Sequence, residues 1–378
     1  MIQVFQPQLG ADELAAVAEV FDSNWIGHGP RTAAFEAQFA EHLDVEPEQL
    51  VFLNCATAGL FLATELLGLT EGDEVVLPSL SFVAAANAVA ASGARPVFCD
   101  VDPRTLNPTV TDVERAVTSR TKAVLVLHYG GLPGDIAAIA HYCRERGITL
   151  IEDAACAVAS RADGKAAGTF GDLAVWSFDA MKVLVCGDGG MLYVRDAEQA
   201  ARARRLAYHG LARPSGFGQA RVSSRWWELD VPEVGRRIVG NDMTAAIGTV
   251  QLRRLPGFVD RRQEIVELYD RELAGIPGLL LPPPLPAGHR STYYFYWVQM
   301  DPDVRDKVAS ELFAAGVYTT FRYPPLHKVP VYGAADQVLP HSDQAADRTL
   351  CLPLHPGLDD SDVRSVATAL RKAMEAHR

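Results

Sequence analysis

The chain has 378 residues, of which 48% are hydrophobic, and its 35 basic and 47 acidic residues give a net charge of −12. This composition is typical of a protein with a large hydrophobic core and unlike that of a disordered chain. The acidic balance disfavours nucleic acid as the main partner, because binding to a phosphate backbone requires a basic face. The longest apolar stretches, such as Ala84–Ala91, are far shorter than the roughly 20 residues that cross a bilayer, and no secretory signal is recognisable. Six cysteines without a C-x-x-C pair indicate reduced thiols, so we expect a cytoplasmic protein without a metal site or a membrane partner.

The first two thirds of the chain alternate between helical and strand-like patterns. Helices are predicted over Ala11–Asp22, Thr32–His42, Gly59–Leu67, Phe82–Ser92, Thr111–Val117 and Gly134–Glu145. Strands are predicted over Val51–Leu53, Glu74–Leu77, Pro96–Cys99, Ala123–His128, Ile148–Glu152, Leu173–Phe178 and Gly190–Val194. Such alternation indicates a parallel sheet covered on both faces, in which ligands bind beyond the carboxyl ends of the strands.

The last third of the chain has a different pattern. A long helical pattern over residues 241–275 leads away from the sheet, and a proline-rich segment follows it. Beyond this segment we predict strands over Tyr293–Met300 and Val317–Arg322 and helices over Val304–Ala315 and Asp360–Glu375. The sequence therefore predicts an α/β protein with a large, mostly parallel α/β/α domain over residues 1–250 and a smaller α+β domain over residues 251–378.

Only six of the 35 basic residues are lysines, and one lysine has an unusual environment. Lys182 lies in Phe178-Asp-Ala-Met-Lys-Val-Leu-Val-Cys186, where nearly all neighbours are apolar or small, whereas the other five lysines lie in solvated contexts. A lysine that loses its hydration has a lowered pKa and can act as a nucleophile or move a proton. Asp153 follows the predicted strand Ile148–Glu152 at its carboxyl end. Taken singly, Asp153 is better explained as a helix cap and Lys182 as a solvated loop residue.

Together, a lysine and a carboxylate are what a pyridoxal phosphate (PLP) site requires, the lysine for covalent attachment and the carboxylate for the ring nitrogen. The phosphate also needs hydroxyls and amides at a helix N-terminus. Cys55-Ala-Thr-Ala-Gly59 supplies them after the predicted strand Val51–Leu53, with Thr57 facing the phosphate, and Ser177 is a second hydroxyl. Phe82 is a candidate for stacking on the pyridine ring. Each has an ordinary alternative, which is a helix cap for Thr57 and core packing for Phe82.

These residues lie in motifs that resemble the DegT/DnrJ/EryC1/StrS family, whose members are PLP-dependent, fold-type I sugar aminotransferases. The motifs follow one another along nearly the whole chain: Val4-Phe-Gln-Pro7, Trp25-Ile-Gly-His-Gly-Pro30, Pro78-Ser-Leu-Ser-Phe82, Glu152-Asp-Ala-Ala155, Gly187-Asp-Gly-Gly-Met191, Tyr323-Pro-Pro-Leu-His327 and Leu352-Pro-Leu354. The resemblance implies that Lys182 binds PLP covalently, that Asp153 partners the ring nitrogen and that Phe82 stacks on the ring. It also implies that Thr57, Ala58 and Ser177 hold the phosphate.

The chain departs from the family pattern at two cofactor positions. Cys156 stands where members often have Gln or Glu beside the cofactor hydroxyl, and a thiol cannot make the same hydrogen bond. Arg237 stands where many members have an Asn that reaches the phosphate of the neighbouring subunit. Arginine is a good phosphate donor, so the contact can persist in another form. Some members replace the lysine by histidine and perform dehydration, and the presence of Lys182 favours transamination.

The resemblance implies transfer of an amino group from L-glutamate to the ketone of a nucleotide-linked sugar, in a homodimer with shared active sites. The short lead into Val4-Phe-Gln-Pro7 and the segment Asn24-Trp-Ile-Gly27 favour members that act at C4 of a 4-keto-6-deoxyhexose. Amination at C3, amination of a cyclitol ketone and a non-catalytic, regulatory PLP-binding role are the alternatives.

A nucleoside diphosphate is anionic, and one segment of this acidic chain is basic. Residues 201–262 hold twelve arginines, no lysine and five carboxylates, an excess of positive charge that could steer a diphosphate to the site. Solvated helix faces explain the arginines at 202–205 and 253–262 equally well. The predicted substrate-binding residues are therefore those of an irregular stretch, Arg213, Arg221 and Arg225, together with His327 at the end of its motif.

Overall fold

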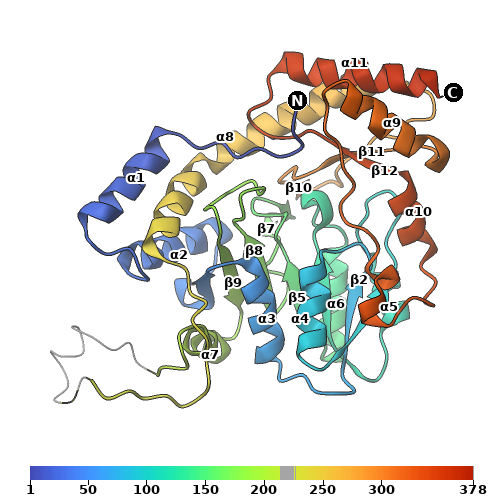
Figure 1. The fold of residues 1–378 in the computed structure, drawn as a ribbon. Helices are drawn as coiled ribbons and strands as arrows, with labels where there is room; N and C mark the ends of the chain where they lie inside the picture. Colours follow the sequence, from blue (N-terminus) through green and yellow to red (C-terminus); the bar gives the residue numbers. More distant parts are fainter. Residues whose placement is uncertain (213–224, 226, 378) are drawn as a thin grey trace.

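The centre of the molecule is a sheet of seven strands in the spatial order β1-β9-β8-β5-β4-β2-β3 (Figure 1). The computed structural model describes residues 1–212, 225 and 227–377. The strands of the sheet are β1 (Leu50–Leu53), β2 (Glu74–Pro78), β3 (Arg95–Cys99), β4 (Thr121–Leu127), β5 (Thr149–Asp153), β8 (Leu173–Ser177) and β9 (Gly190–Val194). Strand β9 runs antiparallel to both of its neighbours, whereas the remaining neighbouring pairs are parallel. The prediction of a mostly parallel sheet is confirmed.

Helices cover both faces of this sheet. One face carries α3 (Ala56–Leu66), α4 (Val83–Ala91) and α7 (Ala197–Ala207). The other face carries α2 (Pro30–Leu43), α5 (Val110–Ala116), α6 (Ile136–Arg146) and the first half of α8 (Asp242–Leu273). Successive side chains of a strand point to opposite faces. In β4, Leu125 packs on the face covered by α3, α4 and α7, while Val124 and Val126 pack on the face covered by α5 and α6. The strands are apolar on both sides because both sides are buried, as predicted.

A second hydrophobic core lies in the C-terminal part of the chain. It is built from β11 (Tyr296–Gln299), β12 (Thr349–Leu352), α9 (Pro302–Ala314), α11 (Asp360–Ala376) and the second half of α8. Helix α8 is continuous between the two cores, with Phe258 in the first and Ile265 in the second. The division at residues 250 and 251 stays a prediction, since the helix runs across it.

The N-terminal segment contacts both the C-terminal core and helix α8. Ile2 packs on the C-terminal core and donates its amide N–H to the carbonyl of Gly316 at 2.8 Å. Helix α1 (Ala11–Asp22), whose bounds match the prediction, then lies along α8 (Figure 1). Helix α10 (Pro340–Arg348) and a small sheet of β6 (Arg161–Ala162), β7 (Lys165–Ala166) and β10 (His289–Arg290) are further elements, together with short 3-10 helices. Within the described ranges, no helix combines the length and the apolar character that a membrane span requires.

One predicted strand does not form. The segment Val317–Arg322 makes only isolated bridges, from Val317 to Ile2 and from Thr320 to Cys351. The strand that pairs with β11 is instead β12, which the sequence pattern did not indicate. The chain leaves the sheet after Thr320, and this departure brings the following residues to the pocket described next.

Candidate active site

A pocket of about 200 Å³ opens beyond the carboxyl ends of three neighbouring strands. Leu127, Asp153 and Ser177 are the last residues of β4, β5 and β8, and all three line it. Its other walls include Thr57, Phe82, Lys182, Tyr294, Arg322 and Tyr323. Parallel sheets of α/β proteins bind ligands at this edge. The structure thus brings five predicted site residues to one place: Thr57, Phe82, Asp153, Ser177 and Lys182.

The carboxylate of Asp153 is buried and nearly without partners. Within the part of the chain that the structure describes, it accepts one hydrogen bond, from the amide N–H of Ala155 at 3.1 Å. Burial raises its pKa above the ordinary value, and the Ala155 amide, Lys182 and His128 offset only part of this effect. The residues after Asp153 form turns, so the alternative of a helix cap does not apply. The carboxylate is placed to receive a cationic N–H group from the pocket.

Lys182 lies in the loop between β8 and β9, and its amine is enclosed by side chains. The Nζ atom is 4.0 Å from Sγ of Cys156 and 4.7 Å from the centre of the Tyr294 ring. Burial acts to lower the pKa of Lys182, but the acidic groups of Cys156, Tyr294, Tyr323 and Asp153 together raise it well above the ordinary value. The expectation of a lowered lysine pKa is therefore wrong for the free chain. The residues next to Lys182 in the sequence are mostly apolar or small, whereas the side chains around its amine in the fold carry acidic groups.

The first turn of α3 offers donors to an anion. Thr57 is exposed to the pocket, and Ser177 faces it from the end of β8. The cap of α3 is Cys55, whose Sγ accepts a hydrogen bond from the amide of Ala58 at 3.4 Å, so the alternative role of Thr57 as the cap is not observed. Ala58 itself is not among the pocket-lining residues. A thiol is a weak acceptor, which leaves the amides of this turn available to a stronger one.

One aromatic ring, that of Phe82, and the thiol of Cys156 complete the predicted set. Phe82 immediately precedes α4 and is 47% exposed, so it is not a core residue. Its ring centre is 5.5 Å from that of Tyr323. Cys156 is buried behind the pocket wall, where burial raises its thiol pKa to about 11. It is therefore a neutral neighbour of the Lys182 amine rather than a reactive thiolate.

The other predicted residues lie away from this pocket or outside the described residues. Arg237 is exposed, with its guanidinium 5.1 Å from the centre of the Tyr208 ring. Arg225 is exposed and forms an ion pair with Glu228. His327 is completely buried, and its Nδ1 is 2.6 Å from the hydroxyl of Ser79. Arg213 and Arg221 fall in 213–224, outside the residues that the structure describes.

Sequence reasoning missed three residues that shape the pocket. Tyr294, Arg322 and Tyr323 line it, although none was named as a site residue. Tyr294 lies in a dense aromatic run and Tyr323 opens one of the family motifs, which were the available signals. Nothing in the sequence distinguished Arg322 from the other arginines.

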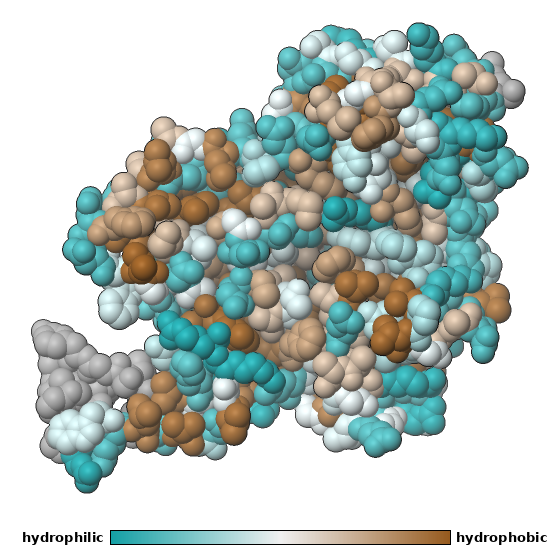
Figure 2. Space-filling model, in the orientation of Figure 1, coloured by the Kyte–Doolittle hydropathy of each residue, from teal (hydrophilic) through white to brown (hydrophobic). Residues whose placement is uncertain are grey.

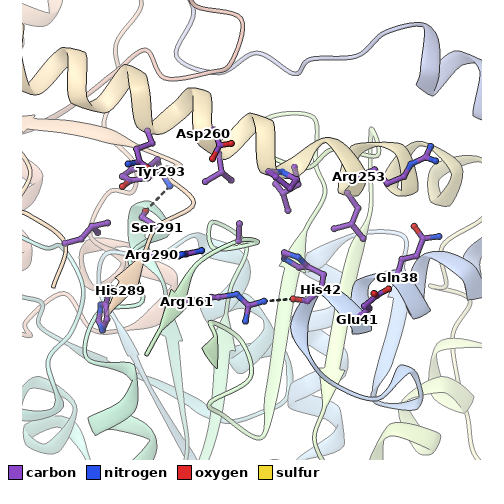
Figure 3. Close-up of a pocket in the computed structure, with 17 residues that line it drawn as sticks. Gln38, Glu41, His42, Arg161, Arg253, Asp260, His289, Arg290, Ser291 and Tyr293 are labelled. Atoms are coloured by element: carbon purple, nitrogen blue, oxygen red, sulfur yellow. Dashed lines mark hydrogen bonds between the residues drawn. The ribbon is translucent and has the colours of Figure 1, made fainter. Parts of the chain in front are cut away.

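A larger cavity of about 930 Å³ lies elsewhere, between α2, α8 and β10 (Figure 3). Arg161 projects into it and donates a hydrogen bond to the carbonyl of His42 at 2.6 Å. The cavity is lined by three arginines and two carboxylates, so its charges nearly balance. It contains none of the predicted site residues and is not the candidate active site.

Comparison with known proteins agrees with this geometry. The model of the DegT/DnrJ/EryC1/StrS aminotransferase family matches residues 7–371. The chain is 64% identical to a Saccharopolyspora spinosa protein named dTDP-4-dehydro-2,3,6-trideoxy-D-glucose 4-aminotransferase, over 100% of this chain and 98% of that one. It is 36% identical to the Bacillus subtilis (strain 168) spore coat polysaccharide biosynthesis protein SpsC, over 97% and 95% of the two chains.

A solved structure, the aminotransferase TlmJ from Streptoalloteichus hindustanus, superposes with a TM-score of 0.96 at 61% identity over the whole of both chains. The predicted fold type and the predicted enzyme class are confirmed by these similarities. The chain therefore belongs to the DegT/DnrJ/EryC1/StrS aminotransferase family.

Proposed function

We propose that the chain uses PLP to transfer the amino group of L-glutamate to C4 of a thymidine-diphosphate-linked 4-keto-6-deoxy sugar. The observation that carries the proposal is that Lys182 and Asp153 line one pocket with an aromatic ring and helix-terminal phosphate donors. The name of the 64% identical relative supports the nucleotide and the C4 position. In the overall reaction the donor's C–NH₃⁺ carbon becomes a ketone while the sugar ketone becomes C–NH₃⁺, so no outside oxidant or reductant is consumed.

The residues of the pocket fit the cofactor. Nζ of Lys182 would attach it covalently. The carboxylate of Asp153, which among the described residues has one hydrogen bond and no cationic partner in contact, would accept the N–H of the ring nitrogen. Thr57 and Ser177 would hold the phosphate with the amides of the first turn of α3, and Phe82 would cover the ring. When bound, PLP supplies a ring that accepts electrons from the reacting carbon.

Two side chains of the protein would then do the acid–base work. Lys182 is the one lysine that lines the pocket. Its Nζ would take a proton from the donor's Cα in the first half-reaction and deliver a proton to the acceptor carbon in the second. Asp153 would remain ionised, because a cationic N–H in contact lowers a carboxyl pKa that burial alone has raised. Cys156, next to the Lys182 amine, would leave the cofactor hydroxyl without the hydrogen bond that a Gln side chain provides.

The sugar nucleotide would approach from the open side of the pocket. Arg225 and Arg213 remain proposed contacts for its diphosphate. His327 would act through Ser79, which lies in the loop that carries Phe82, rather than touch the substrate. Ala58 and Arg237 remain proposed phosphate contacts, Ala58 through its amide and Arg237 across a subunit boundary.

A homodimer is part of the proposal, and the exposed apolar residues of one edge support it. Leu14 and Phe21 on α1 and Trp25 and Ile26 after it are each more than half exposed and form part of an apolar area around α1 (Figure 2). Apolar patches of this kind mark interaction sites. Arg237 is exposed and lies outside the pocket of its own chain, as a residue acting in a partner's site would. We also propose a cytoplasmic location, supported by six cysteines that are all free thiols.

Two measurements on the PLP-loaded protein test the function. Borohydride reduction followed by peptide mapping should place the cofactor on Lys182, and the variant Lys182→Arg should carry none. The visible band should bleach with L-glutamate and return on addition of a keto-sugar. A panel of thymidine-diphosphate 4-keto sugars with and without the 2- and 3-hydroxyls, a 3-keto isomer and a cyclitol ketone would identify the acceptor. Modification of another lysine, or recovery with the 3-keto or cyclitol ketone alone, would contradict the proposal.

A further inference from the structure

We propose that Arg322 binds the α-carboxylate of the amino donor and so selects amino acids for the first half of the reaction. This inference rests on the proposed function and adds a donor-recognition residue to it. Among the residues that the structure describes, Arg322 is the one arginine that lines the pocket with Lys182, and Lys182 is committed to the cofactor. Within this part of the chain, its guanidinium is therefore the cation available there to an anionic substrate.

The guanidinium of Arg322 has no acidic partner among the described residues. Its Nη2 lies 3.6 Å from Sδ of Met181, a weak acceptor, and its Cζ lies 5.0 Å from the centre of the Phe5 ring. Phe5 in turn stacks on Tyr294 at 5.4 Å, and the hydroxyl of Tyr129 donates a hydrogen bond to the backbone carbonyl of Arg322. Backbone and side chain are both supported, yet most of the five N–H donors have no hydrogen-bond partner among the described residues. This arrangement suits a planar anion that arrives with the substrate.

The position of Arg322 relates it to the reacting amine. Cys156 and Tyr294 each lie within electrostatic range of both Lys182 and Arg322. Met181, which Arg322 contacts, immediately precedes Lys182, and Tyr323, which follows Arg322, lies against Phe82. The guanidinium thus lies beside the place where the ring and the reacting carbon would be.

The geometry of the two substrates decides which anion Arg322 serves. In an amino acid the carboxylate is one bond from the carbon that exchanges its amino group. In a sugar nucleotide the diphosphate is attached at C1, across the sugar ring from the C4 ketone. A cation close to the reacting amine therefore meets the α-carboxylate, whereas the diphosphate must lie farther out.

The acidic groups of the pocket make this cation necessary. Asp179 and Asp188 line the pocket, and their charges would repel a donor carboxylate, whereas the charge of Asp153 would be balanced by the ring nitrogen. An oxygen of Asp179 accepts the amide N–H of Met181 at 2.9 Å, so it is held in place. Arg322 offsets this repulsion at the point where the donor must bind. It also fixes the donor so that its Cα–H bond can face Nζ of Lys182.

The test compares the two half-reactions of Arg322→Gln and Arg322→Lys with those of the wild type. We expect Arg322→Gln to lower kcat/KM for L-glutamate on the order of 100-fold, the size typical of removing one partner from a buried, hydrogen-bonded charge pair. Arg322→Lys should recover part of this loss, since it keeps the charge but not the two-pronged geometry. The reaction of the amino-loaded enzyme with the keto-sugar nucleotide should change less than about threefold, because in this proposal Arg322 contacts neither the sugar nor its diphosphate in the transition state. Arg253→Gln, on the larger cavity, is the matched control and should leave both half-reactions unchanged.

A donor without the α-carboxylate sharpens the test. Isoglutamine, the α-amide of glutamate, should react poorly with the wild type and about equally poorly with Arg322→Gln. Cofactor absorption and the melting temperature of each variant report whether the pocket is intact. An equal loss in both half-reactions of a folded, PLP-loaded variant, or a larger loss for the sugar nucleotide, would overturn the inference. Failure of the wild type to react with either substrate would instead overturn the proposed function.

Discussion

The two ends of the central sheet each hold a buried carboxylate, and the protein surrounds the two in opposite ways. At the amino end, Glu74 begins β2 and accepts hydrogen bonds from Arg95 at 2.5 Å, Arg120 at 2.6 Å and Thr118 at 2.6 Å. Burial raises its pKa, but these hydrogen bonds outweigh burial and bring the pKa down to about 2. At the carboxyl end, Asp153 has one hydrogen bond, and burial raises its pKa.

Burial alone does not produce this difference, because a third carboxylate adjoins Asp153 in the same strand. Glu152 points to the opposite face of the sheet. It accepts hydrogen bonds from Nε2 of His128 at 2.8 Å and from the amides of Gly168 at 2.7 Å and Gly171 at 2.5 Å. A buried carboxylate whose acceptor sites are filled stabilises the fold, whereas one left open is available to a ligand. The partners of a carboxylate, more than its depth, therefore indicate its role.

The largest expected effect comes from removing the open carboxylate. Asp153→Asn should lower kcat/KM at least about 1,000-fold, because an amide cannot keep the ring nitrogen protonated. The same variant should make the apoprotein more stable at pH 7, by about 1 kcal/mol, since it removes a buried charge that the fold does not compensate. The sign follows from the raised pKa: the neutral form is the one favoured by folding, so the gain appears at pH values above this pKa and disappears below it. Steady-state kinetics and urea unfolding of the apoprotein measure the two effects. An Asp153→Asn apoprotein less stable than the wild type would contradict the claim that the charge of Asp153 is uncompensated in the fold.

Removing the charge of the filled carboxylate beside it should have the opposite effect on stability. Glu152→Gln should destabilise the protein by about 3 kcal/mol, because it leaves His128 without its anionic partner and turns one backbone amide toward an NH₂ group. Urea unfolding of the apoprotein at pH 7 gives the change, and any loss of activity should follow the folded fraction. A variant as stable as the wild type would show that the three hydrogen bonds do not set the role of Glu152.

The sequence alone was enough to predict the sheet and the position of Asp153 and Lys182 in the site. Alternating strands and helices predicted the sheet, and the position of Asp153 at a strand end predicted which edge binds ligands. The environment of Lys182 and the family motifs identified the lysine. These predictions depend on short stretches of sequence or on motifs shared with a family, so they require no knowledge of contacts between distant segments.

The hydrogen-bond partners of these carboxylates and the remaining pocket residues could not be predicted, because they depend on contacts between segments far apart in the chain. The hydrogen bonds of Glu152 come from residues before and after it, and nothing in the sequence separates it from Asp153. Arg322 and Tyr323 reach the pocket because their segment leaves β12 after the bridge from Thr320 to Cys351, whereas the sequence pattern predicted a continuous strand over Val317–Arg322. The direction of the Lys182 pKa shift was missed for the same reason, since Tyr294 and Tyr323 come from the C-terminal third of the chain.

A smaller effect is expected at the amino end of the sheet. Glu74→Gln should destabilise the protein at pH 7 by about 2 kcal/mol, less than the full pKa shift implies, because Arg95 and Arg120 are more than half exposed and screened by solvent. The folded-state pKa of about 2 lies below the unfolded value of 4.5, so the stabilisation is complete above pH 4.5 and is lost as the pH falls toward 2. Urea unfolding of wild type and variant at pH 7 and at steps down to pH 3 should show the difference shrinking below pH 4.5. Glu19→Gln, whose partner Arg31 is also exposed, is the control and should change stability by less than about 0.5 kcal/mol at every pH.

The smallest effect is expected at the phosphate end of the pocket. It tests whether the backbone amides there, like the carboxylate of Asp153, are left without strong partners in the apoprotein because the cofactor binds them. Cys55 caps α3 with a sulfur that is 3.4 Å from the amide of Ala58, a weak hydrogen bond that leaves this helix terminus incompletely satisfied. Cys55→Ser should stabilise the apoprotein by about 0.5 kcal/mol, since a serine hydroxyl is a preferred cap. In the PLP-loaded protein the gain should shrink, because the phosphate would already satisfy the amides of the same turn. Thermal unfolding with and without PLP measures both values. Cys99→Ser replaces a buried thiol of β3 that packs on the opposite face of the sheet from α3, and it separates a cap effect from a general effect of removing a thiol. An equal gain in both forms would mean that the helix terminus and the cofactor phosphate do not compete for the same donors.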